Sequence, residues 1–136
     1  MAGYSETPLA KKLGIKEGLR IGLVNSPKGF KKELGTLPPD VKLLLGQLPK
    51  PLDLIILFAD SELTLKSQFS LLAEKLSTNG TLWIAWPKKS SGVLTDLSFG
   101  VVQQIGLREG LVDVKICAVN EIWSGLKFVY RLKDRK

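Results

Sequence analysis

The chain has 136 residues, of which 44% are hydrophobic and 24% are charged, and its formal net charge at pH 7 is +7. A chain of this size and composition is typical of one globular domain, so we expect a single domain over residues 1–136. The chain has no histidine and one cysteine, Cys117, which excludes imidazole catalysis, histidine-ligated zinc, four-thiolate metal sites and an internal disulfide.

The first third of the chain predicts short elements separated by glycine and proline. Thr7 is expected to cap a helix that has Pro8 at its first position and ends at Gly14. An apolar run then predicts a strand buried on both faces. The elements predicted here are helices over residues 9–13 and 30–34 and strands over residues 19–25 and 41–45.

The centre of the chain predicts a strand, a helix and a second strand. Residues 52–59 form an apolar strand apart from Asp53, and Asp60 and Ser61 stand where the following helix needs its cap. Apolar side chains then recur at helical spacing through residues 62–77, before Asn79–Gly80 and a strand over residues 81–86. This order predicts a right-handed crossover between two parallel strands.

The last third predicts one helix and two antiparallel strands. Thr95 or Asp96 is expected to cap a helix that runs to about Glu109, and Gly110 follows it. Strands over residues 112–119 and 127–132 are joined by too short a loop for a crossover, so they should pair antiparallel. The predicted fold is α/β: a three-layer, Rossmann-like, mainly parallel sheet with a C-terminal antiparallel hairpin. Residues 21–24, 54–57 and 82–85 should lie side by side at its centre.

The charge and hydropathy patterns predict a cytoplasmic protein. The first residues lack the basic segment and following apolar run that are typical of a signal peptide. The longest apolar run, residues 54–59, is far shorter than the ~20 residues that span a bilayer. The lysines and arginines are scattered, apart from a basic C-terminal end. This scatter favours a solvated basic surface over a nucleic-acid interface.

Three loops should carry the binding site, because ligands of open α/β sheets bind at the carboxyl ends of the strands. Lysines, hydroxyl groups and a nearby helix start would attract a small anion, although an exposed turn is the simpler interpretation of residues 88–92. Asp60 would favour a ligand that also has an amine. The predicted ligand-binding residues are Asn25, Ser26, Asp60, Ser61, Lys88, Lys89 and Ser90.

Other reactive or aromatic side chains predict structural roles. Asp53 and Asp60 lie seven residues apart on one strand, roughly 23 Å, so they cannot act on one substrate atom. Cys117 is expected to be a buried, inert thiol. Trp83 and Trp86 should point to opposite faces, and Trp123 should lie partly exposed in a loop.

Two resemblances support this fold. The runs LDLII (residues 52–56) and NGTLW (residues 79–83), with the C-terminal hairpin, resemble the second half of class I S-adenosylmethionine-dependent methyltransferases. The runs TPLAKKLG (residues 7–14), WIAWPKK (residues 83–89) and WSGLK (residues 123–127) resemble a bacterial family of small proteins of unknown function. The second resemblance implies the fold and brings no established activity.

The chain departs from the methyltransferase pattern in the part that binds cofactor. The glycine-rich turn after the first strand is replaced by residues 24–29, with the sequence VNSPKG, and Gln47 stands near the expected ribose-binding carboxylate. We therefore expect no cofactor. The sequence favours a non-catalytic module that binds a small anionic ligand or a protein partner. The alternatives are a reduced S-adenosylmethionine-dependent methyltransferase-like enzyme and, third, a nucleic-acid-binding module.

Overall fold

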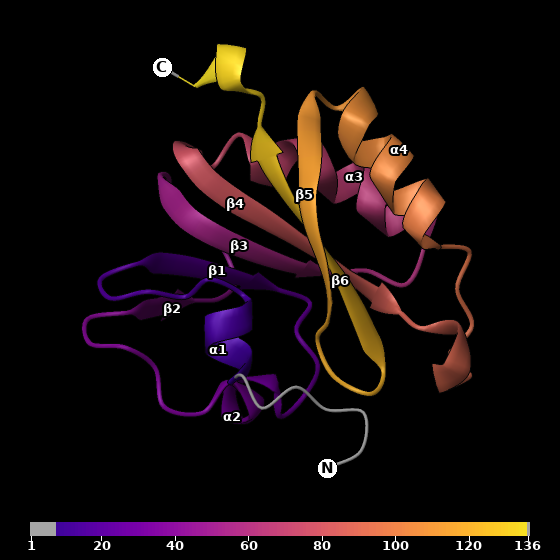
Figure 1. The fold of residues 1–136 in the computed structure, drawn as a ribbon, viewed down its shortest axis with the longest axis horizontal. Helices are drawn as coiled ribbons and strands as arrows, with labels where there is room; N and C mark the ends of the chain where they lie inside the picture. Colours follow the sequence, from indigo (N-terminus) through magenta and orange to yellow (C-terminus); the bar gives the residue numbers. More distant parts are fainter. Residues whose placement is uncertain (1–7, 136) are drawn as a thin grey trace.

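Six strands form one sheet in the computed structural model, which describes residues 8–135 (Figure 1). The sheet order is β2-β1-β3-β4-β6-β5. The strands are β1 (Arg20–Val24), β2 (Lys42–Leu44), β3 (Leu52–Phe58), β4 (Leu76–Pro87), β5 (Leu111–Ala118) and β6 (Trp123–Tyr130). The helices are α1 (Leu9–Lys12), α2 (Phe30–Leu34), α3 (Glu62–Ala73) and α4 (Phe99–Arg108), with 3₁₀ turns η1 (Lys89–Ser91) and η2 (Leu132–Asp134). The predicted cap Thr7 lies outside the described residues.

The register confirms the predicted centre of the sheet. β1 pairs in parallel with β2 and β3, and β3 pairs in parallel with β4. Val24 is opposite Leu57, which is opposite Ile84. β6 lies between β4 and β5 and pairs antiparallel with both, so the hairpin is at one edge as predicted.

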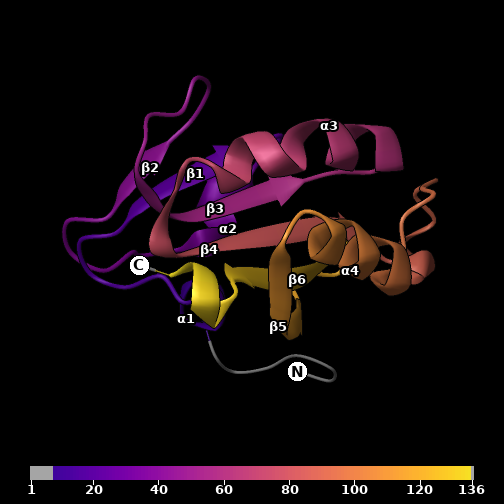
Figure 2. The ribbon, with the colours of Figure 1, turned by 90° about the horizontal axis from the view of Figure 1, so that it is seen from above.

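Two hydrophobic clusters, one on each face of the sheet, make a three-layer fold (Figures 1 and 2). Alternate residues of β3 serve opposite faces: Leu54 and Ile56 pack with α1 and α2, whereas Ile55 and Leu57 pack with α3 and α4. Because both faces are covered, the central strands are mostly apolar, and in β3 the one polar residue is Asp53 near its start.

Two strands begin four or five residues earlier than predicted. α3 ends at Ala73, and β4 begins at Leu76, so residues 74–75 form a turn and residues 76–77 of the predicted helix belong to the strand. Leu76 pairs with Leu52 and is buried; an apolar residue four positions after Leu72 suits a helix face and a strand start equally. β6 begins at Trp123, so Trp123 belongs to the sheet instead of a loop.

The helix caps also differ from the prediction. Ser98 caps α4, because its hydroxyl accepts a hydrogen bond from the Val101 N–H. The Asp96 carboxylate instead accepts from the Glu62 N–H at 2.8 Å, which is the first turn of α3. Thr95 donates to the carbonyl of Asp60 at 2.7 Å. The loop before α4 therefore holds the start of α3.

Candidate functional site

The ends of β1 and β3 are tied together at the carboxyl edge of the sheet. Asn25 follows β1 with a positive φ of 58°, a conformation that asparagine tolerates better than most residues. Its side-chain amide donates to the carbonyl of Phe58 at 3.4 Å. Ser26 comes next and is half-buried. Asn25 thus has a structural bond at the position where the prediction placed a ligand contact.

Asp60 and Ser61 follow β3 and have different roles. The Ser61 hydroxyl accepts from the Thr64 N–H at 3.2 Å and donates to the Thr64 hydroxyl at 3.1 Å, so it caps α3. Asp60 is exposed, and its carbonyl accepts from Thr95. The Asp60 carboxylate is therefore the polar group that this loop presents to solvent.

Lys88, Lys89 and Ser90 lie farther along the sheet. The N–H of Lys88 donates to the carbonyl of Ile122 at 2.7 Å, which ties this loop to the β5–β6 hairpin. Lys89 and Ser90 are exposed in η1, which Figure 1 shows beyond the tip of β4 and away from the β1–α2 loop. The fold brings Asn25 and Ser26 to the end of β3, and it places Lys88–Ser90 apart from them.

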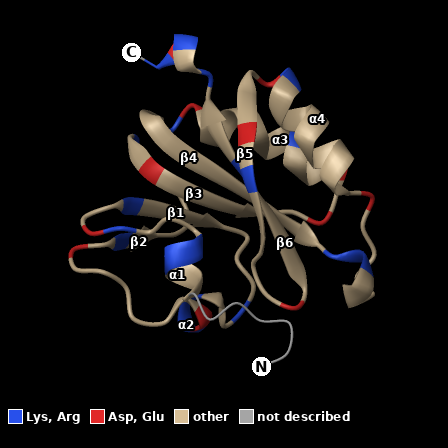
Figure 3. Ribbon diagram, viewed as in Figure 1, with Lys and Arg blue, Asp and Glu red and all other residues tan. Residues whose placement is uncertain are grey.

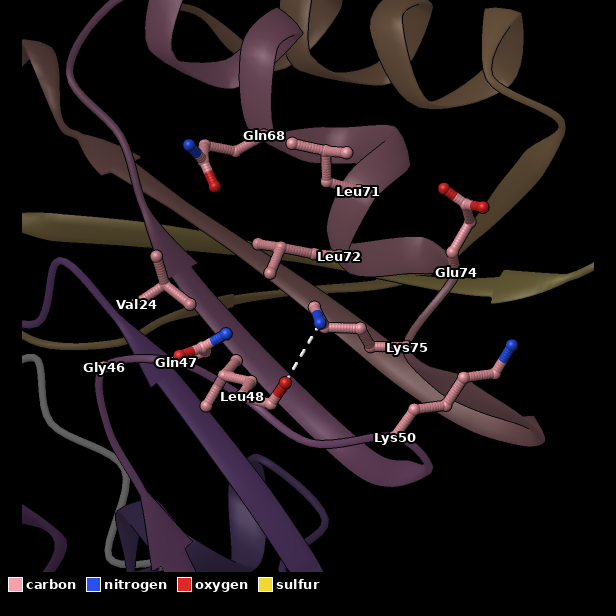
Figure 4. A pocket seen from close by; sticks show the side chains of 10 residues that line it. All are labelled: Val24, Gly46, Gln47, Leu48, Lys50, Gln68, Leu71, Leu72, Glu74 and Lys75. Carbon is pink, nitrogen blue, oxygen red and sulfur yellow. Dashed lines mark hydrogen bonds between the residues drawn. The ribbon is translucent and has the colours of Figure 1, made fainter.

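A groove of about 470 Å³ opens on the α3 face of the sheet (Figure 4). Its apolar walls include the buried leucines Leu48 and Leu72 and the exposed Leu71. The Lys75 ammonium donates to the carbonyl of Leu48 at 2.9 Å. This bond links the end of α3 to the segment between β2 and β3. The lining residues are Val24, Gly46, Gln47, Leu48, Lys50, Gln68, Leu71, Leu72, Glu74 and Lys75.

On the α3 face of the sheet, the β2–β3 segment covers β1. A Cβ built on Gly22 would lie 2.7 Å from a methyl carbon of Leu48, so this loop packs directly on the bare backbone of the strand. A loop covers less of a sheet face than a helix does, and the remaining space is the groove. Its lining includes Val24, the residue before Asn25, so the groove reaches the predicted carboxyl edge.

The sequence prediction did not find the groove residues Gln68 and Lys75. The available signal was Gly22, a single residue without a side chain in a strand otherwise predicted to be buried on both faces. Gln47 was noted only as a departure from the methyltransferase pattern, and it lies in the groove lining.

Two further predicted features have structural roles. Trp123 is half-buried and packs edge-on against Phe58, with ring centroids 5.0 Å apart. Burial raises the pKa of the Cys117 thiol above its usual 9.0, against the opposing effect of Lys12, Lys115 and Lys88. The thiol is half-buried, less so than predicted, and it stays protonated at neutral pH.

Among residues 8–135, no group of three or more histidine, cysteine, aspartate or glutamate side chains is placed to hold a metal ion. In the same part of the chain, no helix has the length and hydropathy needed to cross a membrane.

The fold is shared with solved methyltransferase structures. A precorrin-6y C5,15-methyltransferase from Geobacter metallireducens superposes with a TM-score of 0.66 at 9% identity, covering 90% of this chain and 86% of that chain. A SAM-dependent methyltransferase from Aquifex aeolicus gives 0.62 at 16% identity, covering 88% and 86%. A TehB-like SAM-dependent methyltransferase from Corynebacterium glutamicum gives 0.60 at 13% identity, covering 96% and 91%.

The comparisons of sequence add no family. No protein-family model matches the chain, and no curated protein matches it. At the identities above, the structural similarity concerns the fold alone. The predicted resemblance is therefore confirmed at that level: this chain has the fold of the class I S-adenosylmethionine-dependent methyltransferases.

Proposed function

We propose that this chain is a non-catalytic binding domain with the methyltransferase fold, and that its ligand is a small molecule with an apolar body and an anionic group. The groove on the α3 face carries this proposal. Its volume of about 470 Å³ lies within the range of small-molecule sites, and its lining combines apolar side chains with polar and charged ones.

The polar groups of the groove favour an anion at one end. Lys50 and Lys75 supply two positive charges against the single carboxylate of Glu74. Figure 4 shows the Lys75 ammonium held toward the Leu48 carbonyl, so its position is fixed before a ligand arrives. Gln47 and Gln68 offer amide groups near the other end. An elongated ligand would therefore lie against Leu71 and Leu72 with its anionic group toward the lysines.

The predicted carboxyl-edge loops are a rival position for the same ligand. There, Asn25, Ser26, Asp60 and Ser61 would contact it, with Lys88, Lys89 and Ser90 as the source of charge. The two positions use different lysines, so substitutions can separate them.

The test combines a thermal-shift screen of anionic metabolites with calorimetry on any ligand that raises the melting temperature. For a ligand in the groove, Lys50→Ala with Gln68→Ala should weaken binding tenfold or more, because a charged hydrogen bond contributes about 1.5–3 kcal/mol. Lys88→Ala with Lys89→Ala should leave the affinity unchanged. Lys31→Ala with Lys32→Ala, on exposed positions of α2, is the matched control. If the Lys88/Lys89 variant binds more weakly and the Lys50/Gln68 variant does not, the ligand binds at the carboxyl edge. If neither double variant loses affinity, both positions are wrong.

A reduced S-adenosylmethionine-dependent enzyme is the second candidate, and the shared fold favours it. The residues present do not fit this cofactor. Pro27 removes one backbone donor from the loop after β1, and the Asn25 amide is bonded to Phe58. Gln47 offers an amide where a carboxylate would bind the ribose hydroxyl groups.

We therefore expect no binding of S-adenosylmethionine at physiological affinity. Isothermal titration calorimetry on the full chain measures this directly, with S-adenosylhomocysteine as a second probe. A dissociation constant in the low micromolar range or tighter would support the second candidate against the first.

A further inference from the structure

Four lysines gather on the opposite face of the molecule from the groove, where α1 lies beside β5 and β6. We call Lys12, Lys16, Lys115 and Lys127 the lysine cluster. Lys115 and Lys127 are directly opposite each other in the antiparallel register of β5 and β6. In Figure 3, blue segments mark lysines on α1 and on β5. Paired strands place such residues about 4.5–5.5 Å apart between Cα atoms, and like charges there destabilise a sheet.

Hydrogen bonds hold the cluster together from two elements. The Lys12 ammonium donates to the carbonyl of Ala118 at 2.8 Å, and the Lys115 ammonium donates to the carbonyl of Lys12 at 3.2 Å. The Lys127 ammonium lies 4.0 Å from the position that a Cβ on Gly14 would take, so it faces the end of α1. These bonds to carbonyl groups position the Lys12 and Lys115 ammonium groups, whereas among residues 8–135 the ammonium groups of Lys16 and Lys127 make no hydrogen bond.

No carboxylate of the described residues forms an ion pair with the cluster. Within residues 8–135, none of the four lysines forms an ion pair, and the pair that the fold does form, Lys66 with Glu62, lies on α3. Burial, together with Lys115 and Lys16, lowers the pKa of Lys127. The half-buried Lys127 ammonium therefore lies near other positive charges, which repel it. A bound anion would remove this repulsion.

We propose that the lysine cluster binds a diphosphate or triphosphate group. Lysines contributed by α1, the turn after it and the two strands β5 and β6 suit a compact anion with several charges, and lysine binds phosphate as a point charge. The cluster is a compact patch, which suits a short phosphate chain better than the long backbone of a nucleic acid. This site lies on the other face from the groove and does not depend on the function proposed there.

The experiment measures binding of tripolyphosphate to the full chain by calorimetry at constant ionic strength. We expect binding to the native protein that is at least tenfold weaker in Lys115→Gln with Lys127→Gln. Lys31→Gln with Lys32→Gln removes the same charge from α2 and should leave the affinity unchanged. Equal weakening in both double variants would show unspecific charge attraction and would overturn the proposal, as would absence of binding to the native protein.

Two further measurements keep the result interpretable. The cluster variant should melt at a higher temperature than the native protein without ligand, because it loses a like-charge pair; its loss of binding then cannot come from unfolding. A single-stranded oligonucleotide of twelve bases tests the other source of phosphate. Tripolyphosphate binding that exceeds oligonucleotide binding per phosphate supports the proposal. Binding of the oligonucleotide alone would overturn it in favour of a nucleic-acid interface.

Discussion

Gly106 sets the distance between α4 and β6. A Cβ built on this residue would lie 2.0 Å from Cε1 of Phe128, whose ring is fully buried and packs edge-on against Phe69. The ring cannot move without disturbing the core cluster between α3, α4 and the sheet.

We expect Gly106→Ala to lower the free energy of unfolding by about 1–3 kcal/mol, because an added methyl group overpacks this contact. Gly100→Ala is the control in the same helix, since a Cβ there meets nothing within 4 Å. It should stabilise the protein by up to about 1 kcal/mol through helix propensity. Urea denaturation measures both, and a shift in the same direction for the two variants would contradict this account of the contact.

Trp83 anchors α1 to the sheet by its indole. Its Nε1–H donates to the carbonyl of Leu13 at 2.9 Å, and the side chain is 1% exposed. Trp83→Phe should lower the free energy of unfolding by about 1–3 kcal/mol beyond its packing loss, since the buried carbonyl loses its donor. Trp86→Phe is the comparison, because Trp86 packs in the core cluster of the opposite face, as its spacing predicted. Chemical denaturation measures both variants. If Trp86→Phe lowers the free energy of unfolding more than Trp83→Phe does, the indole hydrogen bond does not anchor α1.

At the scale of elements, α3 depends on a residue that the chain supplies 34 positions later. Asp96→Ala should remove the acceptor of the Glu62 N–H and weaken the start of α3, with a cost of about 0.5–2 kcal/mol. Amide hydrogen exchange should accelerate at Glu62 and remain unchanged at Val101, which Ser98 caps. Ser98→Ala should give the opposite pattern. Acceleration at Val101 in the Asp96 variant would mean that Asp96 supports α4 as the sequence suggested.

Local sequence patterns predicted most elements and missed links between distant ones. The central strands were predictable because residues buried on both faces form apolar runs, as residues 54–58 of β3 do. Asp96 stands two residues before the cap of α4, so a local interpretation assigned it to that helix; only the packing of the loop on α3 reveals its partner. The early start of β4 depends on the pairing of Leu76 with Leu52.

The candidate site shows the same division. The topology predicted which loops follow the parallel strands, and Asn25 does lie at the end of β3. The groove was not predictable in this way, because it arises from what covers β1. That depends on Leu48 packing over Gly22, a contact between a loop and a strand with no periodic signal in the sequence.

At the scale of the whole molecule, the lowered pKa of Lys127 makes the free energy of unfolding depend on pH in the alkaline range. The lowered pKa of Lys127 means that its charged form costs folding free energy at pH values below that pKa. As the pH rises from the folded-state pKa toward the unfolded value of about 10.4, the native state loses the proton first and the cost fades.

Lys127→Met should therefore stabilise the protein at pH 7, and this gain should shrink as the pH approaches 10. Thermal unfolding followed by circular dichroism between pH 7 and about 10 measures the difference between the two proteins. The packing contribution of methionine does not change with pH. A difference in stability that stays constant across the range would mean that the charge of Lys127 does not destabilise the fold.

The two edges of the sheet also bear on how the protein behaves at high concentration. An edge strand with free N–H and C=O groups can pair with another chain and start aggregation. β2 is three residues long and has the exposed Lys42, and β5 has a register irregularity between Asp113 and Lys115 and bears an outward lysine. A short edge, a bulge and edge lysines are the devices by which β proteins prevent such pairing. The like-charged hairpin that we propose as a phosphate site would thus also protect the sheet from aggregation. Substitutions at Lys115 would raise the stability of the fold and weaken this protection.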